Sequence, residues 1–214
     1  MIKAVLFDLD GVLVDAVKLH QQAFIDAIAP YKHITEEEHM RDLNALPTKD
    51  KLEKLKIPEE FREKIYEDKQ EKTWKLISQL IRPIPEVLET ISEIKKKGLK
   101  FAVCSNSIRK STGLFLEHAG VSGFQFYFSN QDVENAKPDP EMYIKAMEKL
   151  GISKDEVLIV EDAPRGLQAA YDSGANVCKV NNPYELKKVL SVLKTYNGSE
   201  EVKQDTYLQE QKEP

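Results

Sequence analysis

The stretch Val5-Leu6-Phe7-Asp8-Leu9-Asp10-Gly11-Val12-Leu13-Val14-Asp15 is an apolar run that is broken by two aspartates and a glycine. Its first part, within residues 3–9, has the length and composition of a buried strand. Strands of a parallel sheet are covered on both faces, so they are apolar throughout rather than alternating. We predict four more strands of this kind, at residues 99–104, 124–129, 157–160 and 176–180.

Helical patterns separate most of these predicted strands. In residues 85–97 the apolar side chains recur on one helical face, and the pattern stops at Gly98, a residue that favours a helix end. A strand followed by a helix, repeated along the chain, predicts an α/β fold with a doubly wound, mainly parallel sheet and a Rossmann-like core. The other predicted helices cover residues 109–119, 140–150, 164–173 and 183–193.

One connection is too long for this rhythm. Roughly ninety residues separate the first two predicted strands, whereas a crossover between parallel strands needs only a dozen or more. Residues 15–83 show only helical patterns, and we predict that they form a small all-helical cap, with Arg82-Pro83-Ile84-Pro85 as its return hinge. The catalytic core would then comprise residues 1–14 and 84–196. Residues 197–214 are polar and are expected to form a mobile tail.

Composition excludes several classes of function. The chain has 214 residues, 41% of them apolar, and a formal net charge of −5, which argues against a general nucleic-acid surface. No apolar run reaches transmembrane length, and the amino-terminal run meets Asp8 too early for a signal peptide. Cys104 and Cys178 lie in apolar runs, where buried free thiols are expected. We expect a cytoplasmic monomer that binds neither nucleic acid nor a membrane.

Polar residues follow four of the predicted strands. The carboxyl ends of parallel strands meet at one edge of the sheet, where open α/β proteins bind their ligands. We therefore predict one site at this edge. Its members are Asp8-Leu9-Asp10-Gly11, Ser105-Asn106, Lys137 and Glu161-Asp162.

The carboxylates of this site need a cation. Asp8 and Asp10 are two residues apart on an extended segment, so both side chains can point the same way. At a few ångströms they repel by about 4 kcal/mol at an effective dielectric constant near 20. Glu161 and Asp162 add oxygen ligands, and an all-oxygen set suits Mg²⁺ better than zinc. We therefore predict a Mg²⁺ site.

The remaining polar groups suit phosphoryl transfer. Lys137 would neutralise charge on the phosphoryl oxygens, and Ser105 and Asn106 could donate hydrogen bonds to them. Each residue also has a simpler interpretation: a helix cap for Ser105 and Asn106, a solvated lysine, or a turn at a strand end. Their joint placement at one edge favours the site.

The same segments resemble the four signature motifs of the haloacid dehalogenase-like hydrolase superfamily, and more narrowly its β-phosphoglucomutase-like branch with a helical cap. The resemblance covers residues 1–193 and implies phosphoryl transfer through an aspartyl-phosphate intermediate. The segments are Val5 to Asp15, Cys104-Ser105-Asn106, Ala136-Lys137-Pro138-Asp139-Pro140 and Val160-Glu161-Asp162-Ala163-Pro164-Arg165-Gly166.

The resemblance implies a role for each residue of the site. Asp8 would attack phosphorus, and Asp10 would protonate the leaving oxygen and then activate water. Mg²⁺ would be held by Asp8, the backbone carbonyl of Asp10 and Asp162, with Glu161 as a ligand or as a support. The phosphoryl group would be held by Ser105, Asn106 and Lys137.

The cap carries weaker signals. His20 and Lys69 lie near positions where the resembled mutases keep a histidine and a lysine, although His20 could equally be an ordinary helix histidine. Thr48 stands where those mutases have a phosphate-binding arginine, and the neighbouring Lys49 would offer a point charge without the guanidinium fork. This difference favours hydrolysis over mutase activity.

The resulting prediction is a phosphatase of small phosphorylated metabolites such as sugar phosphates. A β-phosphoglucomutase-type mutase and a non-catalytic phosphate-binding module are the alternatives. Trp74 is predicted to pack in the core of the cap, and Arg165 has no assigned role. The basic residues Lys49, Lys51, Lys54 and Lys56 are expected to form a solvated helix face with at most one member near the substrate.

Overall fold

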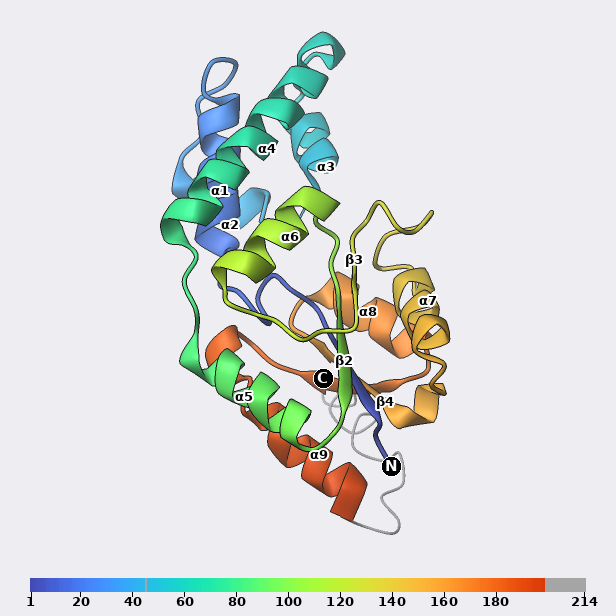
Figure 1. The fold of residues 1–214 in the computed structure, drawn as a ribbon. Coiled ribbons are helices and arrows are strands. Elements are labelled where there is room, and N and C mark those ends of the chain that lie inside the picture. The colour runs from blue at the N-terminus through green and yellow to red at the C-terminus, as the bar shows by residue number, and fades with distance from the viewer. Residues whose placement is uncertain (45, 199–214) are drawn as a thin grey trace, which may run out of the picture.

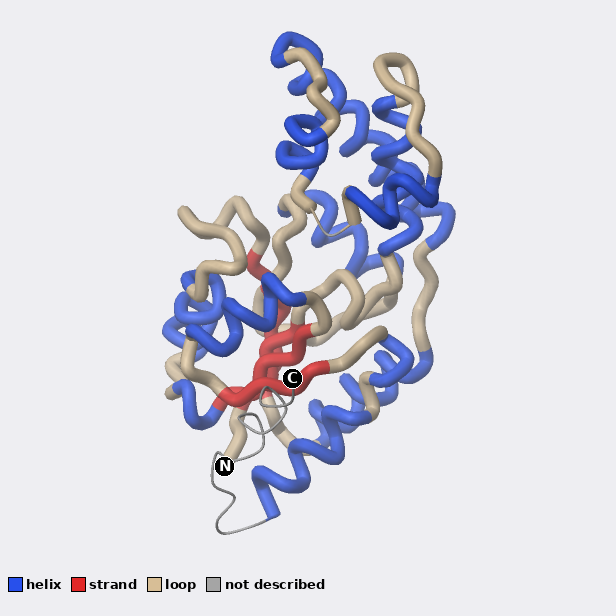
Figure 2. The backbone as a smooth tube through the Cα atoms, turned by 180° about the vertical axis from the view of Figure 1, so that it is seen from behind, coloured by secondary structure: helices blue, strands red, loops and turns tan. Residues whose placement is uncertain are grey.

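The central feature of the molecule is one parallel sheet. The structure, a computed structural model, describes residues 1–44 and 46–198. Within these residues the strand order is β3-β2-β1-β4-β5, and every neighbouring pair is parallel (Figure 2). Strand β1 is central, so Asp8, which follows it, lies at the middle of the carboxyl edge. The strands are β1 (Ala4–Phe7), β2 (Lys100–Cys104), β3 (Tyr127–Phe128), β4 (Val157–Glu161) and β5 (Asn176–Lys179).

Helices cover both faces of the sheet (Figure 1). Val5 and Phe7 of β1 pack on one side, while Ala4 and Leu6 pack on the other, because successive side chains of a strand point to opposite faces. Both sets are fully buried, which explains the continuous apolar sequence of this strand. The first face is covered by α5 (Pro85–Lys96), α6 (Arg109–His118) and α9 (Lys188–Gly198), and the second by α7 (Glu141–Leu150) and α8 (Pro164–Asp172).

A group of helices stands above the carboxyl edge of the sheet, between β1 and β2 in the chain (Figure 1). It has its own apolar core, which includes Phe24, Ile28 and Ile65. We call this group the cap; its domain boundaries at residues 15 and 83 stay a prediction. The helices are α1 (Val17–Ile28), α2 (Glu36–Asp42), α3 (Thr48–Lys54) and α4 (Glu59–Leu80).

The predicted α/β fold is confirmed, and most predicted element boundaries are correct to within two residues. The predicted strand at residues 124–129 is wrong in length, because only Tyr127–Phe128 pair with β2 at this edge of the sheet. The predicted helix at residues 183–193 is also wrong. A short 3₁₀ turn, Pro183–Glu185, comes first, and α9 then continues past residue 193.

The end of α9 overlaps the predicted tail. Asn197 accepts a hydrogen bond from the Ile2 amide at 2.7 Å through its side-chain oxygen, so residues 197–198 belong to the folded core. The rest of the predicted mobile tail, residues 199–214, lies outside the described residues.

The two cysteines and the hydropathy of the helices agree with the expectations from composition. Cys104 and Cys178 are free and buried, and burial raises the pKa of their thiols to about 12 and about 11, so neither is a reactive thiolate at neutral pH. None of the described helices has the length and apolar character needed to span a bilayer.

Candidate active site

The turn after β1 brings two segments of the site into contact. Gly11 has φ = +89°, a conformation that other residues rarely adopt. A Cβ atom at this position would lie 2.1 Å from Oδ2 of Asp162. Glycine is therefore required both by the backbone and by the close approach of Asp162.

Lys137 joins the ends of three strands. Its Nζ donates hydrogen bonds to Oδ1 of Asp8 at 2.7 Å, to Oε1 of Glu161 at 2.6 Å and to the carbonyl oxygen of Cys104 at 2.8 Å. Tyr143 donates to the same Glu161 oxygen at 2.5 Å. Burial alone would lower the pKa of Lys137, which is 2% exposed, but the two carboxylates raise it above its usual value. The lysine is therefore a fixed positive charge.

Asp8, Glu161 and Asp162 form an acidic trio. One carboxylate oxygen from each lies within 4.8 Å of the others, which is the spacing of ligands around one ion. Burial and the charge of Glu161 raise the pKa of Asp8, and they raise that of Asp162 to about 6. Oδ1 of Asp162 is buried and has no hydrogen-bond partner among the described residues. One lysine leaves these carboxylates short of positive charge, and an oxygen-binding divalent cation fits the trio.

Asp10 lies outside this trio and has different surroundings. Its Oδ1 is 3.0 Å from Nε2 of His20, and its Oδ2 accepts a hydrogen bond from Oγ of Ser107 at 3.0 Å. Burial raises the pKa of Asp10, but His20 and Ser107 together lower it below its usual value. The predicted metal contact through the Asp10 carbonyl stays a prediction. Two aspartates two residues apart thus have pKa values shifted in opposite directions, a pattern typical of separate chemical roles.

Ser105 and Asn106, the other predicted phosphate-binding residues, directly follow β2. Ser105 is fully buried at the end of β2 and accepts a hydrogen bond from the Ser107 amide at 3.0 Å. Asn106 donates to the carbonyl of Lys137 at 3.0 Å and accepts from its amide at 3.1 Å, and Arg165 donates to the same carbonyl at 3.0 Å. The side chain of Asn106 thus holds the backbone of Lys137, and a phosphate contact by Asn106 stays a prediction.

The cap residues differ in their relation to the site. His20 contacts Asp10, and the Asp10 carboxylate raises the pKa of Lys69 while burial, the larger effect, lowers it. Lys49 is exposed on α3 and forms no ion pair with a described residue. The structure therefore brings His20 and Lys69 toward Asp10, but it does not bring Lys49 there. Lys51, two residues further along α3, is buried instead.

Trp74 does not pack in the core of the cap, so that prediction is wrong. Its Nε1 donates to Oγ of Ser111 on α6 at 3.0 Å, and Nζ of Lys110 lies 3.4 Å from the centre of its ring. Trp74 also packs against the core of the sheet domain rather than against the apolar core of the cap. It connects the cap helix α4 to the core helix α6, which follows the Ser105-Asn106 segment.

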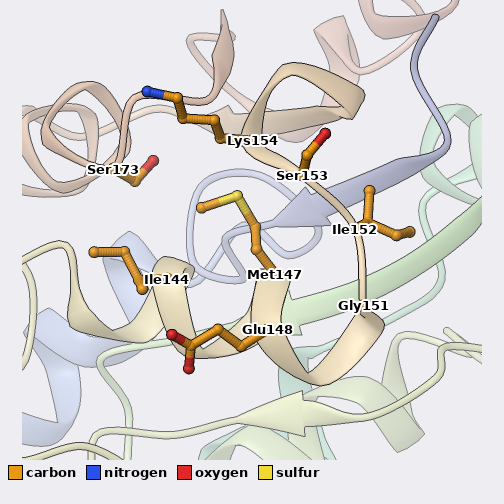
Figure 3. Close-up of a pocket in the computed structure, with 8 residues that line it drawn as sticks. All are labelled: Ile144, Met147, Glu148, Gly151, Ile152, Ser153, Lys154 and Ser173. Atoms are coloured by element: carbon orange, nitrogen blue, oxygen red, sulfur yellow. The ribbon is translucent and has the colours of Figure 1, made fainter.

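A separate hollow lies at the opposite edge of the sheet (Figure 3). Its lining includes Met147, Ile152 and Ser173, from the end of α7, the segment before β4 and the residue after α8. None of the predicted site residues lines it. The acidic trio with Lys137 is therefore the stronger candidate for chemistry.

The chain is similar to known hydrolases in sequence. The family profile described as haloacid dehalogenase-like hydrolase matches residues 5–180. The phosphorylated carbohydrates phosphatase of Thermotoga maritima is 30% identical over 184 residues, which cover 80% of this chain and 82% of that protein. The phosphoglycolate phosphatase of Aquifex aeolicus is 29% identical, with coverage of 80% and 81%.

A solved structure extends the comparison to the fold. The β-phosphoglucomutase of Clostridium difficile matches with a TM-score of 0.76 and 23% identity, over 92% of this chain and 98% of that one. At this level of identity the likeness concerns the architecture and not the reaction.

Proposed function

The chain belongs to the haloacid dehalogenase-like hydrolases, and from this membership we propose that it is a Mg²⁺-dependent phosphatase of small phosphorylated metabolites, with sugar phosphates as the favoured class. The observation that carries the proposal is the bridging of Asp8 and Glu161 by Nζ of Lys137, beside the third carboxylate of Asp162. The proposed nucleophile Asp8, the fixed cation Lys137 and the candidate metal site thus share one edge of the sheet.

Asp8 is the proposed nucleophile. Its carboxylate oxygen attacks phosphorus, the bond from phosphorus to the ester oxygen breaks, and an aspartyl phosphate forms. Lys137 balances charge on Asp8 and on the transferred phosphoryl oxygens without losing its proton, because its pKa is raised. Mg²⁺ held by Asp8, Glu161 and Asp162 would neutralise the charge that accumulates on the phosphoryl group.

Asp10 is the proposed acid and base. It gives a proton to the leaving ester oxygen in the first step; in the second it takes a proton from a water molecule, which attacks phosphorus and releases phosphate from Asp8. The lowered pKa of Asp10 keeps its carboxylate ionised, as the base step requires. The arrival of a phosphate dianion would raise that pKa, because a nearby like charge disfavours the carboxylate, and this suits the acid step.

The substrate class rests on relatives. The T. maritima relative is named for phosphorylated carbohydrates, and the A. aeolicus relative for phosphoglycolate, so both act on small phosphate esters. The cytoplasmic location and the monomeric state stay predictions.

The decisive experiment measures the release of inorganic phosphate from a panel of phosphorylated metabolites, with Mg²⁺ or with a chelator. We expect release only with the divalent ion. Asp8→Asn should lower kcat by about 10³-fold or more, because the amide is not a nucleophile. Asp155→Asn is the matched control, since Asp155 is exposed at the opposite edge of the sheet. Wild-type rates in Asp8→Asn would refute the mechanism.

The same experiment separates the alternatives. A mutase would move phosphate between sugar positions without net release, which NMR of the sugar phosphates detects. A non-catalytic module would bind phosphate but give no release with any substrate. Thr48 in place of a bidentate arginine leaves net hydrolysis as the favoured outcome.

A further inference from the structure

Arg165 contacts the candidate active site through the main chain of Lys137. Its Nη2 donates a hydrogen bond to the carbonyl oxygen of Lys137 at 3.0 Å, although the two residues are 28 positions apart. Within the part of the chain that the structure describes, no carboxylate lies within ion-pair distance of this guanidinium, which belongs to an exposed residue at the start of α8. The partner of Arg165 is thus a residue of the site and not a surface carboxylate.

Lys137 has no regular secondary structure to hold its main chain. It lies in the connection between β3 and α7, residues 129–140, and its amide and its carbonyl both bond to side chains. Asn106, which follows β2, accepts from the amide at 3.1 Å and donates to the carbonyl at 3.0 Å. Arg165 adds a second donor to that carbonyl from the segment after β4. Two separate segments therefore fix the main chain of Lys137.

The segment after β4 holds Lys137 at both ends. Glu161, the last residue of β4, accepts from Nζ at 2.6 Å, while Arg165, four residues later, donates to the carbonyl. Gly166 makes this arrangement possible, because a Cβ atom there would lie 2.1 Å from Oε1 of Glu161. The first turn of α8 thus packs directly on the Glu161 carboxylate, and the Arg165 side chain reaches from that turn to the main chain of Lys137.

The proposed reaction changes the bonds at the ammonium end of this lysine. An ammonium group has three N–H donors, and Asp8, Glu161 and the carbonyl of Cys104 accept all three. Nζ must therefore give up one of these acceptors before it can donate to a phosphoryl oxygen. Asp8 is the acceptor that changes, because its carboxylate becomes an acyl phosphate. During this exchange the bonds to the main chain keep Lys137 in place.

We propose that Arg165 is a positioning residue, which together with Asn106 holds the main chain of Lys137 while Nζ transfers a hydrogen bond from Asp8 to the phosphoryl group. This inference rests on the proposed phosphatase function. It gives Arg165 no contact with the substrate, so its contribution should be the same for every phosphate ester. A guanidinium suits this task, since it stays charged and donates from planar, fixed N–H groups.

Hydrogen–deuterium exchange of residues 129–140 tests these bonds without a substrate. Arg165→Met removes the donors, and exchange in this segment should become roughly 10-fold faster, the effect of losing one hydrogen bond. Asn106→Ala should have a larger effect, because it also frees the Lys137 amide. Gln168→Met is the matched control, since Gln168 is exposed three residues further along α8. The Tm of Arg165→Met should stay within about 4 °C of the wild type, which excludes general unfolding.

Steady-state kinetics of phosphate release with Mg²⁺ tests the positioning role in the reaction. Arg165→Met should lower kcat by roughly 10-fold and change KM less, because precise placement of the ammonium group matters most in the transition state. The factor should be equal for substrates that share only the phosphate, such as glucose 6-phosphate, phosphoglycolate and 4-nitrophenyl phosphate. Arg165→Lys should recover part of the loss, because an ammonium group can donate to the same carbonyl. Gln168→Met should keep the wild-type kcat.

The two sets of measurements distinguish failure of this inference from failure of the proposed function. The inference is overturned if Arg165→Met leaves the exchange of residues 129–140 unchanged, or if it keeps the wild-type kcat. A loss of kcat for one substrate and not for the others would also overturn it, since this would show a contact with the organic part of that substrate. If the wild type releases phosphate from no substrate, the proposed function is wrong, whereas faster exchange in Arg165→Met would still show that Arg165 holds Lys137.

Discussion

Replacing Lys137 by methionine should destabilise the protein, because the acidic trio of Asp8, Glu161 and Asp162 then lacks its cation. Lys137 is buried between Asp8 and Glu161, whose oxygens lie within 4.8 Å of each other. At that separation two carboxylates repel by about 3.5 kcal/mol at an effective dielectric constant of 20. Breaking a buried ion pair by removing one partner costs a similar 3–5 kcal/mol or so.

We therefore expect Lys137→Met to lower the free energy of unfolding by about 3–4 kcal/mol at pH 8 in a chelator, or to lower Tm by roughly 10 °C for a chain of this size. Urea unfolding followed by circular dichroism measures the free energy, and Lys100→Met is the matched control, since Lys100 is exposed at the start of β2. Mg²⁺ should stabilise the variant more than the wild type, because the ion occupies the same carboxylates.

The pH dependence gives the sharper test. The pKa of Asp8 is already raised in the wild type, and losing Lys137 would raise it further, so protonation relieves the repulsion in acid. The destabilisation should be larger at pH 8 than at pH 5. A variant within 1 kcal/mol or so of the wild type at pH 8, without a divalent ion, would refute the idea that Lys137 balances two ionised carboxylates.

Three further outcomes are expected. The pKa of Asp162 is raised to about 6, so protons compete with the metal below this pH. The Mg²⁺ concentration that gives half of the maximal thermal stabilisation should therefore rise as the pH falls from 7 to 5. A concentration that stays constant over this range would contradict the prediction. The pKa of Lys51 is about 8 in the folded state, below its unfolded value of 10.5. The wild type should therefore gain stability relative to Lys51→Met as the pH rises from 8 to 10. A difference in Tm between the two proteins that does not change with pH would count against a buried cation. Trp74 is the chain's single tryptophan, and its indole donates to Ser111 on α6. If the cap moves relative to α6, adding Mg²⁺ and beryllium fluoride should change the tryptophan fluorescence spectrum, and Ser111→Ala should change the spectrum of the unliganded protein. Identical spectra in all these samples would argue for a fixed cap.

The carboxyl edge of the sheet could be predicted because its signals are local in the chain. Each strand is a short apolar run, and the residue that follows it must lie at the edge whatever the details of packing. Asp8 and Glu161 are predicted in this way, and Lys137, which follows β3 after a longer loop, donates hydrogen bonds to both.

The cap was harder to predict, because its charged residues depend on tertiary packing. Lys51 belongs to a basic stretch that has the composition of a solvated helix face. One weak signal was available: Lys51 adjoins Leu52 and lies four residues before Leu55, so it borders the apolar side of α3. Only the packing of Phe24 and His39 against it shows that the lysine is buried.

Two other differences have the same cause. The amide of Asn106 could not be assigned to the backbone of Lys137, because the two residues are 31 positions apart. Ser107 is the third residue of the Ser105-Asn106-Ser107 segment, but its hydroxyl reaches Asp10 only after β1 and β2 pair. Long-range contacts of this kind have no signature in local composition.

The contact between His20 and Asp10 bears on how the enzyme discriminates between substrates. The imidazole belongs to the first cap helix, whereas the carboxylate belongs to the turn after the central strand. If the cap swings away, Asp10 loses the hydrogen-bond partner that fixes the position of its carboxylate, and its readiness to activate water falls with it. A metabolite too small or too weakly charged to hold the cap in place would then be spared even though its phosphate reaches Asp8. The enzyme would thus discriminate between substrates in the rate of hydrolysis as well as in binding, because a phosphate ester that does not close the cap would be hydrolysed slowly.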